Sequence, residues 1–327
     1  MIKCAIHDGP QKFMTTKIVF YSPGKDSQPW LDSFATALPG AEIWAWTPEC
    51  AERQADYAVC WAPPAALFAG QHKLKAIFNI GAGADRVMQI PDIAALTKGA
   101  TIIRLNDAGM AVQMAEYVCH ALIRHTREFA HYEAQQQRHE WKTLPAIDRA
   151  RWPVGIMGLG SIGARVAQAV AAFEYPVFGW SRTRRQLPGV VTFSGRDNLE
   201  RFLREVRVLV CLLPLTGETA GILNADTLGK LKPPAYLINV ARGAHLVECD
   251  LLALLEDETL AGATLDVFGE EPLPPAHAFW NHPRITLTPH ISAITLREES
   301  VKQIVEKIGA LASGNEVDGI VRANIGY

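Results

Sequence analysis

Three side chains with complementary chemistry follow three strand-like runs in the last third of the chain. Arg242, Glu271 and His290 come after the runs Ala235–Val240, Ala261–Phe268 and Ile285–Leu287, in that order. Ligands of open α/β sheets bind beyond the carboxyl ends of the strands, so we expect the three side chains to face one crevice. One such residue would more often be an ordinary surface charge, but three at matching strand ends favour an active site.

These residue types suit the reduction of a carbonyl that stands next to a carboxylate. Histidine ionises nearest to neutral pH, which favours His290 as the proton donor to the carbonyl oxygen. Glu271 could hydrogen-bond the other ring nitrogen, and the Arg242 guanidinium could bind a carboxylate in a bidentate fork. Asp266, in the strand-like run that leads to Glu271, is placed to hold the amide of a nicotinamide, or else to satisfy nearby backbone groups.

A glycine turn supplies the matching cofactor site. The apolar run Val154–Met157 leads into Gly158-Leu159-Gly160-Ser161-Ile162-Gly163, after which apolar residues recur at helical spacing. A strand, Gly-x-Gly-x-x-Gly and a helix are typical of dinucleotide-binding folds, where the pyrophosphate lies at the helix N-terminus. Such turns also join ordinary strands to helices, but the flanking elements favour a nucleotide site formed by these six residues.

The residues after the run Val177–Trp180 indicate which dinucleotide is bound. NAD-binding folds usually place Asp or Glu there to accept the ribose hydroxyls, whereas this chain has Ser181-Arg182-Thr183-Arg184-Arg185. Arginines and hydroxyls would hold a 2′-phosphate through charge-assisted hydrogen bonds, so we predict NADPH; a solvated basic loop is the alternative. We also expect cofactor contacts from residues at two later strand ends: Leu213, Pro214, Val240 and Ala241.

Strand-like and helix-like runs alternate from Lys17 onward, which predicts parallel α/β sheets. A first lobe contains the strand-like runs Lys17–Tyr21, Ile43–Trp46, Tyr57–Trp61, Leu74–Ile80 and Thr101–Leu105. A second lobe contains Val154–Met157, Val177–Trp180, Val190–Phe193, Val206–Leu213, Ala235–Val240, Ala261–Phe268 and Ile285–Leu287. The loop Gly81-Ala82-Gly83 in the first lobe is either an anion nest of backbone N–H groups or a plain flexible turn.

Two helices are expected to connect the lobes. A single long helix should begin at Met110, because no helix breaker appears before Pro145 and Val112 to Phe129 show one apolar face. The amphipathic helix around residues 301–311 could pack back on the first lobe. We therefore predict two Rossmann-like or flavodoxin-like doubly wound domains with the active site in the cleft between them. Residues 1–109 and 296–327 would form a discontinuous substrate domain, and residues 110–295 the dinucleotide-binding domain.

The composition argues against several other classes of protein. The 327 residues, 49% of them hydrophobic, suffice for two domains, and a net charge of −2 predicts neither a nucleic-acid nor a membrane partner. With no membrane-length apolar run and no secretory signal pattern, we expect a cytoplasmic protein. The six cysteines are scattered through apolar runs, which favours reduced thiols over disulfides or a metal site. Residues before Lys17 lack periodicity and could be an alternative start.

Four motifs follow one another along the chain. They are the glycine turn, Asn239-Val240-Ala241-Arg242-Gly243, Leu265-Asp266-Val267-Phe268-x-x-Glu271-Pro272 and Thr288-Pro289-His290. Together they resemble the D-isomer-specific 2-hydroxyacid dehydrogenases, from the first strand to the last helix. The resemblance implies that Arg242 binds substrate, that Glu271 pairs with His290 and that His290 is the acid/base. It also implies that backbone amides of Ala82 and Gly83 bind the substrate carboxylate, and that subunits pair as homodimers through the dinucleotide-binding domain.

Within this family, residues 55–61, 81–85 and 180–184 and the short first lobe resemble the bacterial enzymes that reduce glyoxylate and hydroxypyruvate. The resemblance implies an oxidoreductase that forms glycolate and D-glycerate from these 2-ketoacids. Trp61, at a strand end, would then form a wall of the substrate pocket, or else pack in the core. The alternatives are a reductase for another 2-ketoacid and a non-catalytic NAD(P)-sensing protein; the presence of Arg242, Glu271 and His290 favours an enzyme.

Overall fold

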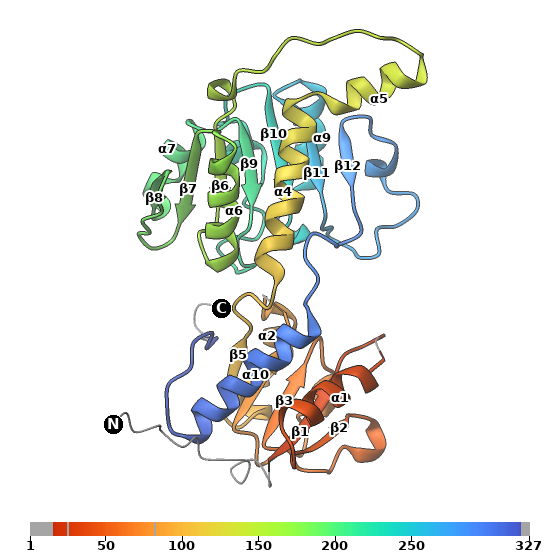
Figure 1. Ribbon diagram of the computed structural model, residues 1–327, viewed down its shortest axis with the longest axis vertical. Coiled ribbons are helices and arrows are strands. Elements are labelled where there is room, and N and C mark those ends of the chain that lie inside the picture. Colours follow the sequence, from red (N-terminus) through yellow and green to blue (C-terminus); the bar gives the residue numbers. More distant parts are fainter. Residues whose placement is uncertain (1–15, 25, 82, 322–327) are drawn as a thin grey trace, which may run out of the picture. The chain divides into compact units, whose positions relative to one another are not determined.

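The structure is a computed structural model that describes residues 16–24, 26–81 and 83–321. The chain divides into two units (Figure 1). One consists of the described parts of Met1–Ala108 and Thr295–Tyr327, and the other of Gly109–Ile294. Ala82, which we predict to bind a carboxylate, and all but residue 16 of the expected lead-in lie outside the described residues.

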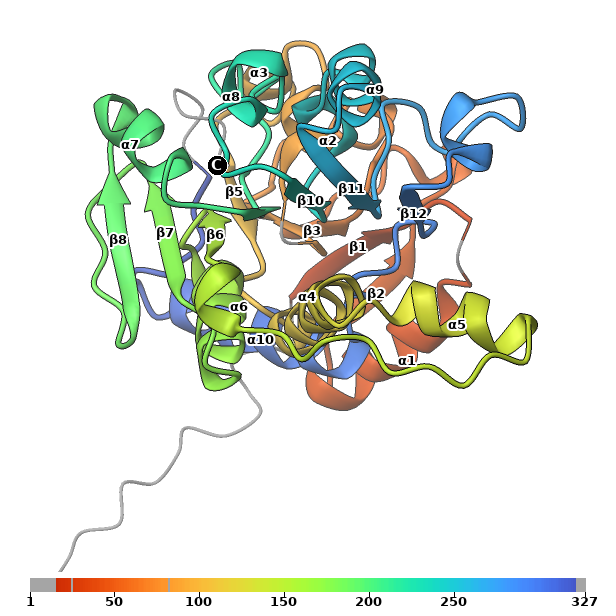
Figure 2. The same cartoon turned by 90° about the horizontal axis from the view of Figure 1, so that it is seen from above.

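The first unit is built on a five-stranded parallel sheet with the flavodoxin-like order β2-β1-β3-β4-β5. The strands are β1 (Lys17–Tyr21), β2 (Glu42–Ala45), β3 (Tyr57–Cys60), β4 (Ala76–Asn79) and β5 (Thr101–Arg104). Helices α1 (Gln28–Ala37) and α10 (Arg297–Ala312) lie on one face of the sheet, and the short helices α2 (Asp85–Met88) and α3 (Ile93–Leu96) lie on the other (Figure 2). Because both faces are covered, every residue of β3 and β4 is buried.

The carboxyl-terminal helix α10 packs against α1 in this first unit. Its apolar face is buried at Val301, Ile304 and Ile308. Lys307, also buried, donates to the carboxylate of Asp318 and to the carbonyl oxygen of the same residue, both at 2.8 Å. Ile320 then pairs with Ile103 of β5, so the end of the described chain is tied to the edge strand.

The second unit contains a seven-stranded parallel sheet with the order β12-β11-β10-β9-β6-β7-β8, which is the Rossmann order with one further strand. The strands are β6 (Val154–Met157), β7 (Val177–Ser181), β8 (Val190–Ser194), β9 (Val208–Cys211), β10 (Ala235–Asn239), β11 (Leu260–Leu265) and β12 (Ile285–Leu287). Helices α4 (Met110–Thr126) and α6 (Ser161–Ala172) lie on one face (Figure 2). The other face carries α7 (Leu199–Leu203), α8 (Ala225–Leu228) and α9 (Glu248–Glu256). The predicted class of two doubly wound parallel sheets is confirmed.

The strands before the predicted site residues are shorter than expected. β11 ends at Leu265 rather than Phe268, and β9 covers only the centre of the predicted run. The partner strand β12 ends at Leu287 and is followed two residues later by Pro289, which has no N–H to continue a ladder. Asp266 therefore lies just beyond its strand, in a turn.

The predicted long helix begins at Met110 as expected and buries Ala115, Val118 and Leu122, but its expected continuation past Thr126 is wrong. The structure has α4 and a separate helix α5 (Phe129–Gln137), because Glu128 adopts the left-handed conformation with a φ of 53°. Val112 and Phe129, expected on the same apolar face, are 48% and 39% exposed. Neither Pro nor Gly stands at the break, so the sequence pattern carries no signal for it.

His125, near the end of α4, packs in an aromatic cluster against the sheet. Its ring stacks on Tyr236 of β10 with the centroids 3.8 Å apart and meets Trp152 edge-on at 5.3 Å. The buried Nε2 has no hydrogen-bond partner among the described residues. Burial, and secondly the charge of Arg207, lowers the pKa of His125 to about 4, so the ring is neutral at pH 7.

We expect the stability to fall as the pH drops from about 6.5 to about 4. In this window the unfolded chain, where the pKa of the histidine is 6.5, binds a proton that folded His125 does not bind. The full difference corresponds to about 3 kcal/mol of unfolding free energy. Urea unfolding at pH 7 and pH 4.5 should show less pH dependence in His125→Phe, which keeps an aromatic ring. His120→Phe, at an exposed site on the same helix, should behave as the wild type; an unchanged pH dependence in His125→Phe would contradict this explanation.

Candidate active site

The glycine turn between β6 and α6 has the geometry that a dinucleotide requires. Gly158 has a φ of 102°, and a Cβ on Gly163 would lie 1.8 Å from the carbonyl oxygen of Gly158, so the helix packs directly on the turn. A Cβ on Gly160 would meet nothing within 4 Å, which leaves open space beside the N-terminus of the 12-residue helix α6. These residues therefore fit a pyrophosphate, which such helix N-termini bind through unpaired N–H groups.

Two further residues of the turn differ in environment. Leu159 is buried against Gly179 of β7. A Cβ added to Gly179 would lie 2.7 Å from the side chain of Leu159. Ser161 is exposed at the first position of α6, and Ile162 is half-buried. Leu159 therefore packs the turn on the neighbouring strand, while Ser161 lies on the exposed side of the turn.

The segment after β7 is basic and has a defined shape. Ser181 is buried, and its hydroxyl donates to the carbonyl oxygen of Thr183 at 2.8 Å. Arg182, Thr183 and Arg184 are exposed, and Asp and Glu do not occur between Ser181 and Ser194. The residues thus fit an anionic 2′-phosphate better than a neutral ribose.

The turn after β10 holds Arg242 through its own backbone. The buried side chain of Asn239 donates to the carbonyl oxygen of Arg242 at 3.2 Å and accepts from the N–H of Ala241 at 3.2 Å. Arg242 Nη1 donates to the carbonyl oxygen of Ala241 at 2.7 Å. His245, fully buried, lies with Nδ1 3.2 Å from the N–H of Arg242 and Nε2 3.3 Å from the carbonyl oxygen of Pro214. Asn239 thus shapes this turn through local bonds, while His245 also ties it to the loop after β9.

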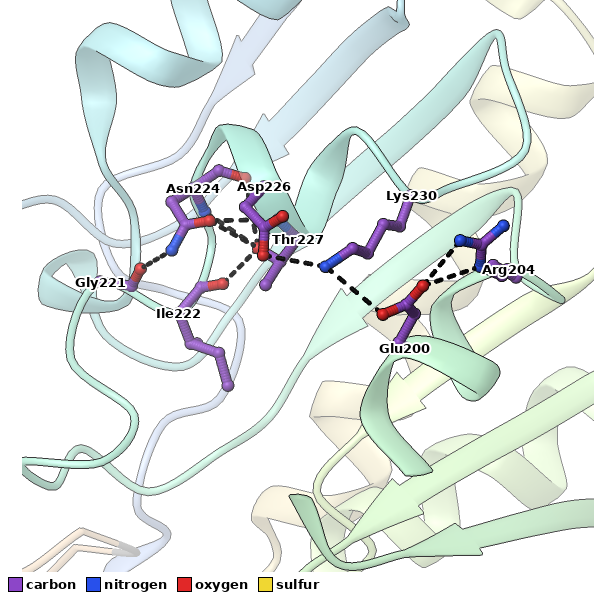
Figure 3. A network of polar contacts seen from close by, with 8 residues as sticks. All are labelled: Glu200, Arg204, Gly221, Ile222, Asn224, Asp226, Thr227 and Lys230. Atoms are coloured by element: carbon purple, nitrogen blue, oxygen red, sulfur yellow. Dashed lines mark hydrogen bonds and ion pairs between the residues drawn. The ribbon is translucent and has the colours of Figure 1, made fainter. Parts of the chain in front are cut away.

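The loop after β9, which contains Leu213 and Pro214, is anchored at both ends. Thr219 donates to the carbonyl oxygen of Pro214 at 2.7 Å. At the far end Asn224 caps α8 by accepting from the N–H of Thr227 at 3.1 Å and donates to Gly221 (Figure 3). Helix α8 is in turn tied to α7 by Lys230, which is 2.9 Å from Asp226 and 3.8 Å from Glu200 (Figure 3). Leu213, Val240 and Ala241 are all buried at their strand ends.

The turns after β11 and β12 bring Glu271 and His290 together. Oε2 of Glu271 lies 2.9 Å from Nδ1 of His290, while Oε1 accepts from the backbone N–H of Phe268 at 3.0 Å. Because Nδ1 donates to the carboxylate, Nε2 is the ring atom that can exchange a proton with a ligand. The side chains are 40% and 27% exposed for His290 and Glu271, so the pair is accessible.

Asp266 is engaged with the backbone of the turn after β12. Its fully buried carboxylate accepts from the hydroxyl of Thr288 at 2.6 Å and from the N–H groups of Ile291 and Ser292, both at 2.8 Å. Of the two interpretations offered by the sequence, these contacts support the one in which Asp266 satisfies nearby backbone groups.

Neighbouring strand ends in this sheet are packed on one another. A Cβ on Gly243 would lie 1.8 Å from the backbone of Phe268, so the turn that carries Arg242 rests on the turn that leads to Glu271. The turn that leads to Glu271 contacts the turn of His290 through the Glu271 side chain. Arg242, Glu271 and His290 are thus brought to one edge of the seven-stranded sheet.

The predicted substrate loop belongs to the other unit, at the end of β4. The ring of Trp61 lies on Gly81, where a Cβ would approach the ring to 2.5 Å. Asn79 is fully buried and donates to the carbonyl oxygens of Gly81 and Gly83 at 3.2 Å and 2.8 Å. A side chain at position 81 would therefore displace the Trp61 ring. Asn79 shapes the loop around the predicted Gly83 amide.

The described part of the chain offers neither a metal site nor a membrane-spanning helix. Among residues 16–24, 26–81 and 83–321, three or more His, Cys, Asp or Glu side chains nowhere gather in a way that could hold a metal ion. In the same ranges, every helix is too short or too polar to cross a membrane.

A Rossmann-ordered sheet with a glycine turn defines a dinucleotide-binding domain, and the Arg, Glu and His at its edge define a candidate dehydrogenase site. The family model described as "D-isomer specific 2-hydroxyacid dehydrogenase, NAD binding domain" matches residues 119–292. The chain belongs to the D-isomer specific 2-hydroxyacid dehydrogenases.

Similar proteins in this family carry more particular names. A glyoxylate/hydroxypyruvate reductase A of Serratia proteamaculans is 45% identical over 95% of this chain and 99% of its own length. A D-isomer specific 2-hydroxyacid dehydrogenase of Xanthobacter autotrophicus, solved with NADPH and MES, is 35% identical, with a TM-score of 0.89 over 95% of this chain and 99% of that one. An NADPH-dependent glyoxylate/hydroxypyruvate reductase of Sinorhizobium meliloti, solved with NADP and sulfate, is 34% identical. Its TM-score is 0.87, and the match covers 95% of this chain and 100% of that one.

Proposed function

We propose that the protein reduces small 2-ketoacids with NADPH, converting glyoxylate to glycolate and hydroxypyruvate to D-glycerate. The proposal rests on the His290–Glu271 pair, 2.9 Å apart, which lies at the same carboxyl-terminal edge of the sheet as Arg242 and the glycine turn. The names of the relatives from Serratia and Sinorhizobium support the choice of substrates.

The chemistry divides among three side chains. Arg242 binds the ketoacid and polarises its carbonyl, since a guanidinium forms paired hydrogen bonds with oxygen. His290 gives the proton on Nε2 to the carbonyl oxygen, and Glu271 stabilises the positive charge of the ring before that transfer. The reduced nicotinamide, when bound, supplies the hydride for the carbonyl carbon. The products are therefore a 2-hydroxyacid and the oxidised cofactor.

The two units take separate parts in this proposal. Residues 110–295 bind the dinucleotide, with the pyrophosphate at the glycine turn and the 2′-phosphate at Ser181 to Arg184. Leu213, Pro214, Val240 and Ala241 contribute further contacts, while Asp266, whose buried carboxylate is bonded to the turn after β12, acts on the nicotinamide side of the site through that turn. Residues 1–109 and 296–327 bind the substrate, with its carboxylate on the amides of Ala82 and Gly83 and with Trp61 as a wall.

A panel of 2-ketoacids tests the proposal. Glyoxylate, hydroxypyruvate, pyruvate and a bulkier ketoacid are mixed with NADPH or NADH, and the absorbance of the reduced nicotinamide is followed. Rapid oxidation of NADPH with the first two substrates is the expected result. Turnover with only another ketoacid would show that this ketoacid, and neither glyoxylate nor hydroxypyruvate, is the substrate. Tight NADPH binding without any turnover would favour a dinucleotide-sensing protein.

Replacing Arg182 and Arg184 together by alanine should raise the KM for NADPH about 10- to 100-fold, because charge-assisted hydrogen bonds to the 2′-phosphate are lost. The KM for NADH, which lacks this phosphate, should change less than about twofold. Arg165→Ala, at an exposed site on α6 outside this segment, is the matched control. Equal changes in the two KM values would show that the segment does not read the 2′-phosphate.

We also propose that the protein is a cytoplasmic homodimer that pairs through the dinucleotide-binding unit. Phe129 and Trp141 of that unit are 39% and 102% exposed, and a second subunit would cover such apolar surface. The five described cysteines are free thiols, as is usual in a reducing compartment. Sedimentation velocity should give twice the mass of one chain; a single-chain mass at micromolar concentration would rule out the dimer.

A further inference from the structure

His290 has a strained backbone conformation, which contacts with neighbouring groups must stabilise. Its φ is 55°, in the left-handed region that costs energy for residues other than glycine. The ring itself is 40% exposed and is held by one side chain, Glu271. The direction of the imidazole therefore depends on what fixes the backbone of residues 288–294.

Asp266 fixes the middle of this segment. Its carbonyl oxygen accepts from the N–H of His290 at 2.9 Å, and its carboxylate accepts from the next two N–H groups, those of Ile291 and Ser292. Three successive N–H groups thus point at one buried residue. A left-handed residue at position 290 is what turns successive amides toward one acceptor.

Helix α4 holds the two ends of the same segment. The hydroxyl of Tyr117 lies 2.5 Å from that of Thr288, which in turn donates to Asp266 at 2.6 Å. One turn earlier on the helix, Gln113 donates to the carbonyl oxygen of Ile294 at 2.9 Å and accepts from its N–H at 3.0 Å. Residues four apart share a helix face, so a single face of α4 contacts both ends.

The hydroxyl chain has a definite direction. Thr288 uses its only hydroxyl hydrogen on Asp266, so Tyr117 must be the donor to Thr288. Burial raises the pKa of Tyr117 to about 12, which keeps the phenol protonated and able to donate. Asp266 thereby receives its hydrogen bond from Thr288 in an orientation that Tyr117 sets.

We propose that Tyr117 and Thr288 are positioning residues for His290, acting through Asp266, while Gln113 holds the far end of the segment. This inference rests on the proposed function, in which His290 is the acid/base. Removing either hydroxyl lets the turn shift, and small displacements of a catalytic group cost large factors in rate.

The first test compares Tyr117→Phe and Thr288→Val with a matched control, Tyr175→Phe. Tyr175 forms the same kind of bond, 2.8 Å to the hydroxyl of Thr126, which is also on α4. We expect either test variant to lower kcat for glyoxylate about tenfold, with the KM for NADPH unchanged. The kcat of the double variant should lie within about twofold of the lower of the two single-variant kcat values, because both changes break the same chain of hydrogen bonds. Tyr175→Phe should lower the melting temperature to a similar extent and keep the wild-type kcat.

The second test observes the imidazole directly by NMR of protein labelled with ¹⁵N-histidine. The signal of His290, assigned by its loss in His290→Gln, should shift or broaden in Tyr117→Phe and in Thr288→Val and stay in place in Tyr175→Phe. Unchanged kcat and an unchanged His290 signal in both test variants would overturn the inference. If His290→Gln itself keeps full turnover, the proposed function fails, and the NMR result still decides whether Tyr117 positions the ring.

Discussion

Replacing His290 by glutamine should lower kcat for glyoxylate reduction by about 10²- to 10⁴-fold, the usual contribution of a general acid. Glutamine has nearly the volume of histidine and can still donate to Glu271, but it offers no proton of suitable acidity to a carbonyl oxygen. Only the proton transfer is removed, so the KM for NADPH should remain within about twofold of the wild-type value. Stopped-flow measurement of NADPH oxidation, with cofactor affinity from nicotinamide fluorescence, tests both expectations.

The control for this substitution is His277→Gln. His277 pairs with Glu248 at 3.1 Å, which makes it a second His–Glu pair in the same unit, outside the proposed site. Its replacement should leave kcat close to that of the wild type. A His290→Gln enzyme with undiminished kcat would remove this histidine from the mechanism, whatever the effect at position 277.

Arg242→Ala should lower kcat/KM for glyoxylate by about 10²- to 10³-fold, as the loss of one preorganised donor at a developing charge typically does. Arg242→Lys should recover only a small part, since lysine keeps the charge but lacks the planar fork. Arg242 is held by Asn239 through its carbonyl oxygen, a bond that either substitution can retain, so the turn after β10 should keep its shape.

The measurement for Arg242 is a full set of KM and kcat values for glyoxylate and for NADPH. The loss should appear in the glyoxylate parameters, while cofactor binding stays near the wild-type affinity. Arg284→Ala, at a half-buried arginine just before β12, serves as the matched control. Equal losses for substrate and cofactor would indicate that Arg242 supports the fold of the domain and has no specific contact with the ketoacid.

Much of the second sheet was predictable from local pattern. β6 and β12 have the predicted bounds, and the ends of the other strands differ from the predicted ones by a few residues at most. Runs of buried apolar residues separated by turn residues are strong signals in parallel sheets, because both faces are covered. The ends are weaker signals, since a ladder stops where its partner stops. β11 ends at Leu265, the residue that pairs with the last residue of β12, Leu287.

The helices were less predictable. Nothing in the composition of residues 126–129 marks the end of α4, because a left-handed glutamate breaks the helix where no glycine or proline stands. The burial of His125 is also a tertiary effect, since its partners Tyr236 and Trp152 come from distant parts of the chain.

By itself the sequence determined which residues stand at which strand ends. The glycine turn, the basic segment after β7 and the placement of Arg242, Glu271 and His290 all follow from local order, because the carboxyl ends of parallel strands share one edge. Only the tertiary structure decided what holds those residues. Asp266 with the amides of residues 291 and 292, Tyr117 with Thr288 and His245 with Pro214 are contacts between separate segments. Such contacts depend on how helices and turns pack, and hydrogen bonds between distant residues leave no periodic trace in the chain.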